Sequence, residues 1–240
     1  CLASGAKSSI CAQCARDFPP PATGCTICGE QLAAVSTKTV DNTPLTDKGQ
    51  AVTDPTEKRQ YCGHCLTSPP AYRFCRSAFR YDFPIRQIIH RLKYHEEGFW
   101  GAPLADAAWP AFKASFANYS KALLLPVPMH ASQYQQRRDN HAELIATRLG
   151  AWSGFRVDTQ LVSKQVNTTR QAELSGKARR LNLKHAFAIN KNANPPQAPI
   201  IIVDDVSTTG TTVNAIAKLI KNHYDQEIFG FTLAKRSLAD

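Results

Sequence analysis

Residues 201–212 read IIVDDVSTTGTT, and the interpretation of the whole chain starts from this stretch. The β-branched run over 200–203 predicts a buried strand, because such side chains pack well in a sheet. Asp204 and Asp205 follow at the carboxyl end of that strand, where ligands bind in open α/β sheets. A buried charge is costly unless it is paired. The two acids therefore indicate a functional site, and the alternative is a turn before an N-capped helix.

The residues after the acids form a short loop of small hydroxyl residues that leads into a predicted helix over 211–224. The N–H groups at a helix N-terminus bind anions, and Gly210 lets the backbone turn tightly and approach a ligand. Phosphate donors then lie near two carboxylate acceptors, so a ribose 5-phosphate fits, with its two ring hydroxyls on the aspartates. The residues predicted to bind ribose phosphate are Asp204, Asp205, Ser207, Thr208, Thr209, Gly210, Thr211 and Thr212.

The flanking sequence alternates between strand-like and helix-like segments, which predicts an α/β domain with a parallel sheet covered on both faces. The predicted strands are 72–81, 121–128, 155–161, 198–205 and 227–236. The predicted helices are 84–95, 102–117, 141–152 and 211–224, and 178–187 is expected to be partly helical. Pro110 is expected to break the second of these helices, because proline removes a backbone donor. On the first helix, His90, Lys93 and His95 are interpreted as a basic surface near the ligand, with a metal site as the alternative.

The 240 residues carry a formal net charge of +10, and the sequence pI is about 9.3. A basic chain favours anionic partners such as nucleic acid, nucleotides or phospholipid headgroups, and the alternative is a basic protein without such a partner. Apolar residues make up 43% of the chain, which is enough for an ordinary core and excludes wholesale disorder. No apolar run approaches the ~20 residues of a membrane span, so an integral membrane protein is not expected.

Seven of the eight cysteines lie within the first 65 residues, and six of them form three CxxC pairs. The pairs are Cys11/Cys14, Cys25/Cys28 and Cys62/Cys65. Each pair puts two thiolates on one tight turn, which is half of a tetrahedral Zn²⁺ site; redox chemistry of the pairs is the alternative. The zinc would be structural and would stabilise a small domain that has little core of its own. Cys75 lies on an apolar strand and is expected to be an inert core thiol.

The stretch 201–212 closely resembles the phosphoribosyl pyrophosphate signature of type I phosphoribosyltransferases. With the N-terminal cysteines, four further segments make nearly the whole chain resemble the ComF family of competence and DNA-utilisation proteins. They are PIRQIIHRLKYH (84–95), PVPMH (126–130), NHAELIA (140–146) and RQAELSGKARRLNLKHAF (170–187). The last of them matches the family pattern at Gln171, Leu174, Arg179, Asn182, Ala186 and Phe187. The central loop departs from the family, because RRDNHA (137–142) stands where RGFNQA is usual and is one residue shorter if Asn140 is aligned.

The resemblance implies a type I phosphoribosyltransferase-like parallel sheet with helices on both faces, preceded by a small cysteine-zinc domain. We expect a zinc-ribbon-like domain over 1–70 and a phosphoribosyltransferase-like domain over 71–240, with Pro69 and Pro70 at the boundary. The family usually opens with another CxxC pair, so Cys1 is expected to be the second member of a pair whose first member precedes it. The implied ligands are Cys1, Cys11 and Cys14 at one metal site and Cys25, Cys28, Cys62 and Cys65 at the other.

In type I transferases a loop after an earlier strand holds pyrophosphate, and PVPMHASQYQQRR (126–138) occupies that place in chain order. His130, Arg137 and Arg138 are the candidate pyrophosphate ligands, because a guanidinium binds two phosphate oxygens at once; a basic surface loop is the alternative. Mg²⁺ is expected with phosphoribosyl pyrophosphate. Some purine transferases place an aspartate base where this chain has Thr208, and other members work without it. Catalysis is therefore not excluded, but no catalytic residue is predicted.

The resemblance implies a cytoplasmic protein that binds phosphoribosyl pyrophosphate, or a related ribose phosphate, and acts in the uptake or use of external DNA. Single-stranded DNA is the expected partner, with other DNA-uptake proteins as further candidates. The residues expected to contact its backbone lie where type I transferases have a hood over the active site, and are Lys164, Arg170, Lys177, Arg179, Arg180 and Lys184. Two alternatives stay open: a transferase of ribose phosphate to an unknown acceptor, and a regulator that senses phosphoribosyl pyrophosphate.

Overall fold

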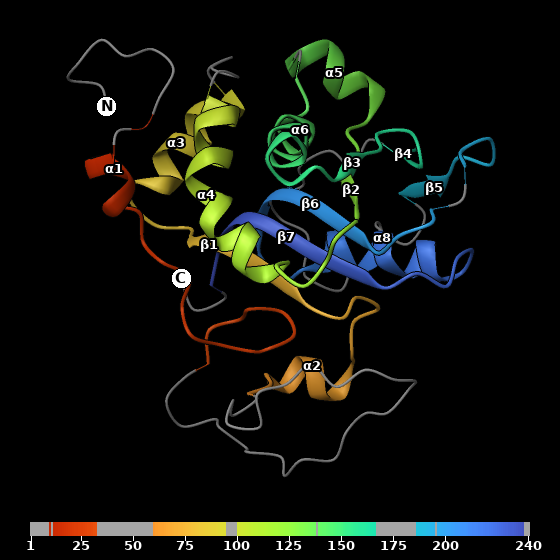
Figure 1. Ribbon diagram of the computed structural model, residues 1–240, viewed down its shortest axis with the longest axis horizontal. Coiled ribbons are helices and arrows are strands. Elements are labelled where there is room, and N and C mark those ends of the chain that lie inside the picture. The colour runs from red at the N-terminus through yellow and green to blue at the C-terminus, as the bar shows by residue number, and fades with distance from the viewer. Residues whose placement is uncertain are drawn as a thin grey trace.

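The structure is a computed structural model in which residues 10, 12–32, 60–94, 100–137, 139–166, 186–194 and 196–237 are described. Its centre is a five-stranded sheet in which all neighbouring strands run parallel (Figure 1). In spatial order the strands are β1 Cys75–Arg80, β7 Ile228–Lys235, β6 Ile200–Ser207, β2 Leu123–Pro126 and β3 Arg156–Val157. The predicted α/β class with a parallel sheet is confirmed.

The strand β6 lies in the centre of the sheet and carries the acid pair. Its residues 200–203 are fully buried, which explains the unbroken apolar run in the sequence. Pairing with β2 ends at Val203, whereas pairing with β7 continues to Ser207. Asp204 and Asp205 therefore lie inside β6, just beyond the carboxyl end of β2, and the strand ends two residues later than the sequence predicted.

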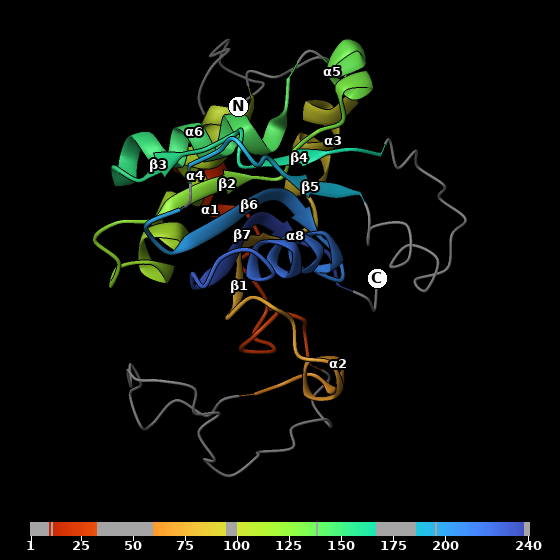
Figure 2. The same ribbon diagram turned by 90° about the vertical axis from the view of Figure 1, so that its right-hand side faces the viewer.

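Three helices cover one face of the sheet: α3 Ile85–Tyr94, α4 Gly101–Ser115 and α6 His141–Ser153. Figure 2 shows α6 on the opposite side of the sheet from α8 Thr211–Lys221. In the core beneath α4, the ring of Phe112 packs edge-on against that of Phe231, with 5.0 Å between centroids.

The expected break of α4 at Pro110 is wrong, because the helix runs through this residue. The rings of Trp109 and Phe112 stack at 5.9 Å on either side of the proline, and Phe112 is buried against the sheet. Packing against the sheet thus keeps both halves of α4 in one helix, although proline removes one backbone donor.

The other face of the sheet is covered by α8 and by an antiparallel hairpin of β4 Val162–Lys164 and β5 Phe187–Ile189. The apolar side of α8 is buried there and consists of Val213, Ile216, Ala217 and Ile220. The structure therefore has helices on both faces, as predicted.

The chain between β3 and β4 differs from the strand predicted over 155–161, because β3 is only two residues long. Asp158 ends it by accepting hydrogen bonds from the backbone N–H groups of Gln160 and Leu161, at 2.8 and 2.9 Å. Of the segment 178–187, which was expected to be partly helical, 178–185 lie outside the described residues and Phe187 begins β5.

The N-terminal part of the chain contacts the α/β core both after its first short helix and in the cysteine-rich stretch. The short helix α1 Ala12–Arg16 leads to Phe18, whose buried ring packs edge-on against Phe79 at 5.2 Å. The cysteine-rich stretch contacts β1, where Cys75 N donates to Ile27 O at 2.7 Å. Its helix α2 Gly63–Thr67 lies below the sheet in Figure 1. The proposed domain limits, 1–70 and 71–240, stay predictions.

A further short helix, α5 Ala131–Arg137, follows β2 at the carboxyl edge of the sheet. In the part of the chain that the structure describes, no helix is both long enough and apolar enough to span a membrane.

Candidate functional site

The acid pair lies next to a lysine and a histidine that come from two helices on one face of the sheet. Lys93 Nζ, in α3, lies 2.9 and 2.8 Å from the two carboxylate oxygens of Asp205. His141 Nδ1, at the start of α6, lies 3.9 Å from Asp205 Oδ2, and the histidine side chain is buried. Asp205 therefore has an ion-pair partner inside the protein, which compensates for the partial burial of its charge.

Asp204 has no such cation in direct contact among the described residues, and its environment favours the neutral acid. Its Oδ1 accepts a hydrogen bond from the backbone N–H of Asp205 at 2.9 Å. Burial, together with the negative charge of Asp205, raises the pKa of Asp204 to about 7, while the positive charges of Lys93 and Lys164 limit the rise. A bound cation, or the hydroxyl donors of a sugar, would favour the ionised form.

The loop after β6 encloses a small cavity of about 50 Å³, lined by Asp204 and residues 206–213. This is more than the ~30 Å³ share of one water molecule. Gly210 caps α8 with a φ of +70°, a backbone conformation that favours glycine, and a Cβ there would lie 2.9 Å from the Tyr72 hydroxyl oxygen. Ser207 Oγ is buried and finds no hydrogen-bond partner among the described residues. A ligand oxygen in this cavity would satisfy that costly unpaired group.

All eight residues predicted to bind ribose phosphate therefore lie in one stretch, from the carboxyl half of β6 to the first turn of α8. The hydroxyl groups of Thr209 and Thr211 share a hydrogen bond within it. Backbone N–H groups, hydroxyl groups and two carboxyl groups thus gather at the carboxyl edge of the sheet, which is the chemistry that a sugar phosphate requires.

The loop after β2 begins beside the acid pair, because Val127 N donates to a β6 carbonyl, that of Val203, at 2.9 Å. Asn140 ties the far end of the loop to its start, since its Nδ2 donates to Val127 O at 3.1 Å. The same side chain caps α6 by accepting from Ala142 N at 3.1 Å. The two ends of this loop are therefore fixed next to the carboxyl edge of β6.

Three residues of this loop were predicted to bind pyrophosphate. His130 precedes α5, and its Nδ1 lies 2.8 Å from Ser132 Oγ. Arg137 is the last residue of α5, and Arg138 lies outside the described residues. The structure brings the backbone of His130 and Arg137 to the same edge of the sheet, and their binding role stays a prediction.

The six basic residues predicted to contact DNA lie at the end of β4 and in the segment between β4 and β5. Lys164 ends β4 and pairs with Phe187, and Gln165 N donates to Ala186 O at 2.8 Å, so the two ends of the segment meet. The charge of Lys164 acts on the carboxyl of Asp204, so the hairpin lies near the acid pair. The other five residues lie outside the described residues: Arg170, Lys177, Arg179, Arg180 and Lys184.

Four of the predicted metal ligands form a cluster in the cysteine-rich stretch. The Sγ atoms of Cys25, Cys28, Cys62 and Cys65 all lie within 4.8 Å of one another. Those of Cys28 and Cys62 are 3.6 Å apart. Four thiolates around one tetrahedral zinc ion would lie roughly 3.8 Å apart, given Zn–S bonds of about 2.3 Å, so the cluster fits a metal such as zinc.

The thiols of this cluster shift one another's pKa values. Hydrogen bonds from Cys28 and Cys65 lower the pKa of Cys25, and the contact with Cys25 raises the pKa of Cys28 to about 12. The contacts with Cys25 and Cys28 also raise the pKa of Cys65. A metal ion has to displace the remaining protons, so its affinity should fall as the pH falls.

The remaining cysteines have different environments. Cys14 is not part of the cluster, and Cys1 and Cys11 lie outside the described residues, so the other predicted metal site stays a prediction. Cys75 is buried at the start of β1, and burial raises its pKa to about 11. A buried thiol with a raised pKa agrees with the expectation of an inert core residue.

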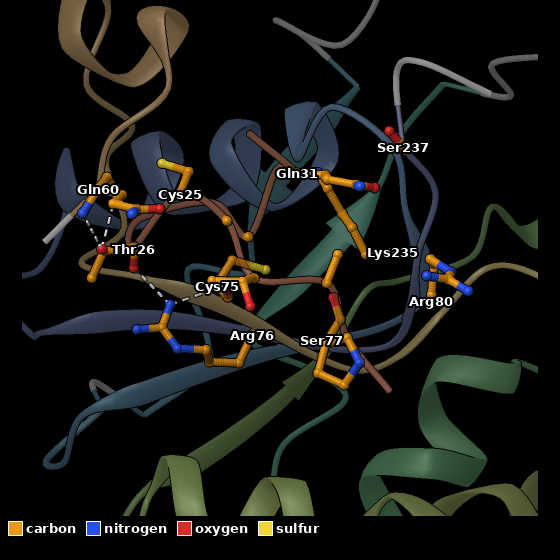
Figure 3. A pocket seen from close by; sticks show the side chains of 15 residues that line it. Cys25, Thr26, Gln31, Gln60, Cys75, Arg76, Ser77, Arg80, Lys235 and Ser237 are labelled. Carbon is orange, nitrogen blue, oxygen red and sulfur yellow. Dashed lines mark hydrogen bonds between the residues drawn. The ribbon is translucent and has the colours of Figure 1, made fainter. Parts of the chain in front are cut away.

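A cavity of about 420 Å³ lies between the cysteine-rich stretch and β1 (Figure 3). Arg76, Arg80 and Lys235 line it, and its described lining contains no acidic side chain. Arg76 is turned toward the cysteine-rich stretch and donates to Thr26 O at 2.7 Å. Lys235 also donates a hydrogen bond to the carbonyl oxygen of Thr208, so it contacts both this cavity and the loop after β6.

Sequence reasoning missed His141 and Lys235, and it described Lys93 only as part of a basic surface. The signal for Lys235 was its place at the end of the strand that follows β6, because the carboxyl ends of neighbouring parallel strands meet at one edge. Lys93 pairs with Asp205, which lies 112 residues further along the chain. No local pattern identifies such a partner, and the same holds for His141.

Comparisons with known proteins agree with this geometry. A family model described as a phosphoribosyl transferase domain matches residues 142–237, which include β6, its loop and α8. Competence protein F of Haemophilus influenzae is 31% identical over 180 residues, covering 73% of this chain and 79% of that protein. DNA utilization protein YhgH of Salmonella typhimurium is 33% identical over 165 residues, covering 66% and 70%. Competence protein ComFC of Bacillus subtilis is 24% identical over 167 residues, covering 67% and 63%.

Proposed function

Because the chain belongs to the ComF family of competence and DNA-utilisation proteins, we propose that it binds phosphoribosyl pyrophosphate, or a related ribose phosphate, with Mg²⁺. The site is the loop between β6 and α8 together with the acid pair. The protein acts in the uptake or use of external DNA, because its relatives are named for competence and DNA utilization.

The observation that carries this proposal is the arrangement of polar groups around the loop cavity. Ser207 Oγ is buried without a partner among the described residues, and the carboxyl of Asp204 lines the same cavity. The loop N–H groups and the first turn of α8 supply donors for a phosphate. A ligand with a phosphate at one end and vicinal hydroxyls at the other fits both groups of side chains.

The ligand's orientation follows from the same groups. The 5-phosphate lies in the loop over 207–212, and the ribose hydroxyls reach Asp204 and Asp205, directly or through Mg²⁺. The pyrophosphate then extends toward the loop after β2, where His130, Arg137 and Arg138 are the proposed ligands. When bound, Mg²⁺ neutralises charge on the pyrophosphate and favours the ionised form of Asp204.

The test is a calorimetric titration with phosphoribosyl pyrophosphate and Mg²⁺. Replacing both acids, Asp204→Asn and Asp205→Asn, keeps their shape and removes their charge. Charge-assisted hydrogen bonds contribute about 1.5–3 kcal/mol each, so we expect binding to weaken by roughly tenfold or more.

A matched control makes the same change of charge at two exposed positions, Asp17→Asn with Asp225→Asn, and should bind as the parent does. Equal affinity in the parent and in the acid-pair variant, with both folded, would show that the acids do not hold the ribose. Absence of binding to the parent protein would reject the site itself.

The second part of the proposal concerns single-stranded DNA. The basic segment begins at Lys164, whose positive charge lowers the pKa of Asp204. Lysine and arginine bind phosphates without reading bases, which suits a protein that handles DNA of any sequence. The segment between β4 and β5 is therefore the proposed DNA contact.

One observation favours a second candidate function, transfer of ribose phosphate to an acceptor. The family model that matches the site is that of a transferase domain. The loop, however, carries Thr208 where some purine transferases have an aspartate base, so the acceptor remains unidentified. Release of pyrophosphate with a candidate acceptor would favour the enzyme, whereas salt-sensitive DNA binding without turnover favours the DNA role.

A further inference from the structure

Lys235 is the last residue of β7 and lines the larger cavity (Figure 3). Its buried ammonium group contacts two separate parts of the molecule. The side chain is only 8% exposed. Its Nζ donates to the carbonyl oxygen of Thr208 at 2.5 Å and lies 3.1 Å from Oε2 of Glu30. Thr208 belongs to the loop over 207–212, which is the proposed phosphate site and is called the ribose phosphate loop below. Glu30 belongs to the cysteine-rich stretch. One buried cation therefore joins the two.

The position of Glu30 depends on the turn that presents two of the clustered cysteines. Glu30 comes two residues after Cys28, and its carbonyl oxygen accepts from Cys25 N at 2.8 Å. Gly29, between them, has a φ of +69° and donates to Cys25 O at 2.8 Å. A metal ion on the two cysteines fixes this turn, and with it the start of the glutamate side chain.

The direction of the Thr208 carbonyl determines the direction of the next N–H group in the loop. The carbonyl of Thr208 and the N–H of Thr209 belong to one planar trans peptide, so they point in opposite directions. Because Lys235 holds the carbonyl on its own side, the N–H is aimed away from the lysine. If the peptide rotates, the loop loses a correctly directed donor for a phosphate.

A second set of contacts joins the same two regions. Tyr72, which follows the second pair of clustered cysteines, is buried with its hydroxyl against Gly210. Ala71 N donates to Asn214 Oδ1 at 2.8 Å, and Asn214 N donates to Gly210 O at 2.9 Å. The first turn of α8 thus contacts residues 71 and 72, which follow the cysteines. These contacts fix the position of the loop relative to the cluster.

We infer that Lys235 is a positioning residue that couples metal binding at the four-cysteine cluster to the conformation of the ribose phosphate loop. The metal fixes the turn before Glu30, Glu30 holds the ammonium group, and the ammonium group holds the Thr208 peptide. Loss of the metal releases this chain of contacts and loosens the loop. The consequence for ligand affinity rests on the proposed function, whereas the consequence for the loop itself does not.

The test compares the full chain with and without zinc by two measurements. Zinc is removed by dialysis against a chelator, and Mg²⁺ is added back before any titration. Hydrogen–deuterium exchange of the amides over 208–212 reports on the loop without a ligand. Calorimetry with phosphoribosyl pyrophosphate reports on binding. We expect zinc removal to speed exchange in the loop and to weaken binding by about fivefold or more, as is usual for coupled sites.

The decisive variant is Lys235→Met, which removes the ammonium group and leaves all four cysteines in place. We expect it to retain zinc, to exchange its loop amides as fast as the metal-free parent, and to lose most of its response to zinc removal. Glu30→Gln keeps a hydrogen-bond acceptor for Lys235. Its response to zinc removal should lie between those of the parent and Lys235→Met. It also serves as the test if Lys235→Met does not fold.

Two controls separate this link from other effects of the same changes. Arg73→Met breaks the ion pair with Glu227 at the other end of β1 and β7, and should respond to zinc as the parent does. Cys11→Ser with Cys14→Ser removes the other predicted metal site and should also leave the response intact. Both controls retain the Glu30–Lys235–Thr208 contacts.

Three results overturn the inference. One is a loop whose exchange does not change when zinc is removed from the parent. Another is an exchange rate that rises equally in the parent and in Lys235→Met when zinc is removed. A third is a rise that is equal in the loop and in every strand of the sheet, because it indicates general loosening of the fold. Failure of the proposed function looks different, because the parent then binds no phosphoribosyl pyrophosphate in either state while zinc still slows loop exchange through Lys235.

Discussion

Two adjacent carboxyl groups in β6 are accommodated in different ways. Asp205 contacts the ammonium group of Lys93, so its charge is paired. Asp204 is buried beside that charge, and its pKa is raised to about 7 because burial and Asp205 both disfavour ionisation. Binding of a cation or a sugar favours the ionised form of this residue. Ligand binding should therefore release the Asp204 proton.

The first prediction at this scale concerns the pH dependence of stability. The usual pKa of an aspartate is about 3.9, so the folded protein binds the Asp204 proton more tightly than the unfolded chain does. The stabilisation from the protonated form is complete below about pH 4 and is lost as the pH rises to about 7. Relative to the parent, Asp204→Asn should therefore become progressively more stable between pH 5 and pH 8.

Urea unfolding at several pH values, without Mg²⁺ or ligand, measures this difference. Asparagine retains an oxygen that can accept the hydrogen bond from Asp205 N, so the comparison isolates the charge. A difference in unfolding free energy that stays constant from pH 5 to pH 8 would mean that Asp204 is already ionised throughout this range.

At the scale of single elements, the hairpin of β4 and β5 determines where the basic segment begins and ends. Its three residue pairs hold Lys164 opposite Phe187, on the face of the sheet that α8 also covers. Both ends of the intervening segment are therefore fixed at this hairpin, since Gln165 N donates to Ala186 O.

We expect the double substitution Arg179→Ala with Arg180→Ala to weaken single-stranded DNA binding and to flatten its salt dependence. Each phosphate contact contributes about −0.7 to the slope of log affinity against log salt, so the slope should change by about one unit. Fluorescence anisotropy with a labelled oligonucleotide at several salt concentrations measures it, and zinc content should stay the same.

A different result would contradict the assignment of these arginines to DNA. If these arginines close over pyrophosphate instead, the double variant loses phosphoribosyl pyrophosphate binding while its DNA affinity and salt slope stay those of the parent. Lys113→Ala with Lys121→Ala removes the same charge at two exposed positions, near the end of α4 and before β2 respectively, and is the control for a general electrostatic effect.

The elements that the sequence predicted well are those with strong local patterns. The strands β2, β6 and β7, which have mostly apolar sequences, and the periodic helices α3 and α8 are all present close to their predicted bounds. The break at Pro110 and the strand over 155–161 were wrong, because aromatic packing overrides the proline and Asp158 turns the chain early. The acid pair and its loop were predicted from residue order alone, since all their parts are contiguous.

The partners of the acid pair and of Lys235 could not be predicted in the same way. Lys93 and His141 lie near Asp205, and Glu30 contacts Lys235, so three separate segments of the chain supply them. Their ion pairs depend on which strands are neighbours, and no periodicity in the sequence carries that information. The cysteine cluster is the exception, because the spacing of each CxxC turn already brings two ligands together.

At the scale of the whole molecule, the four-cysteine cluster connects two stretches of chain that flank residues 33–59. Thr26 and Gln60 reinforce the junction, since Gln60 N donates to Thr26 Oγ1 at 3.1 Å and Thr26 N donates to Gln60 O at 2.7 Å. The two CxxC turns are thus aligned by backbone contacts as well as by the proposed metal. Metal binding should therefore stabilise the fold as well as the cluster.

We expect Cys25→Ser with Cys65→Ser to lose one equivalent of zinc and to lower the temperature of unfolding. Both residues are buried and belong to the cluster. Cys75→Ser changes another buried thiol outside the cluster, so it should keep the zinc of the parent even if it is less stable. Elemental analysis of the purified proteins decides the matter, and an unchanged zinc content in the double variant would mean that the cluster holds no metal.

The order of strands in the sheet has a consequence for how the protein is made. β7 is the last strand to be synthesised among those described, yet it lies between β1 and β6. Until residues 228–235 have left the ribosome, the nascent chain holds two strands with open edges, and one of them contains the apolar run of β6. Lys235 cannot hold the Thr208 carbonyl earlier either, because it is the final residue of β7. The contacts of Lys235 should therefore form only after residue 235 has been translated, and termination before β7 would leave a product that tends to aggregate.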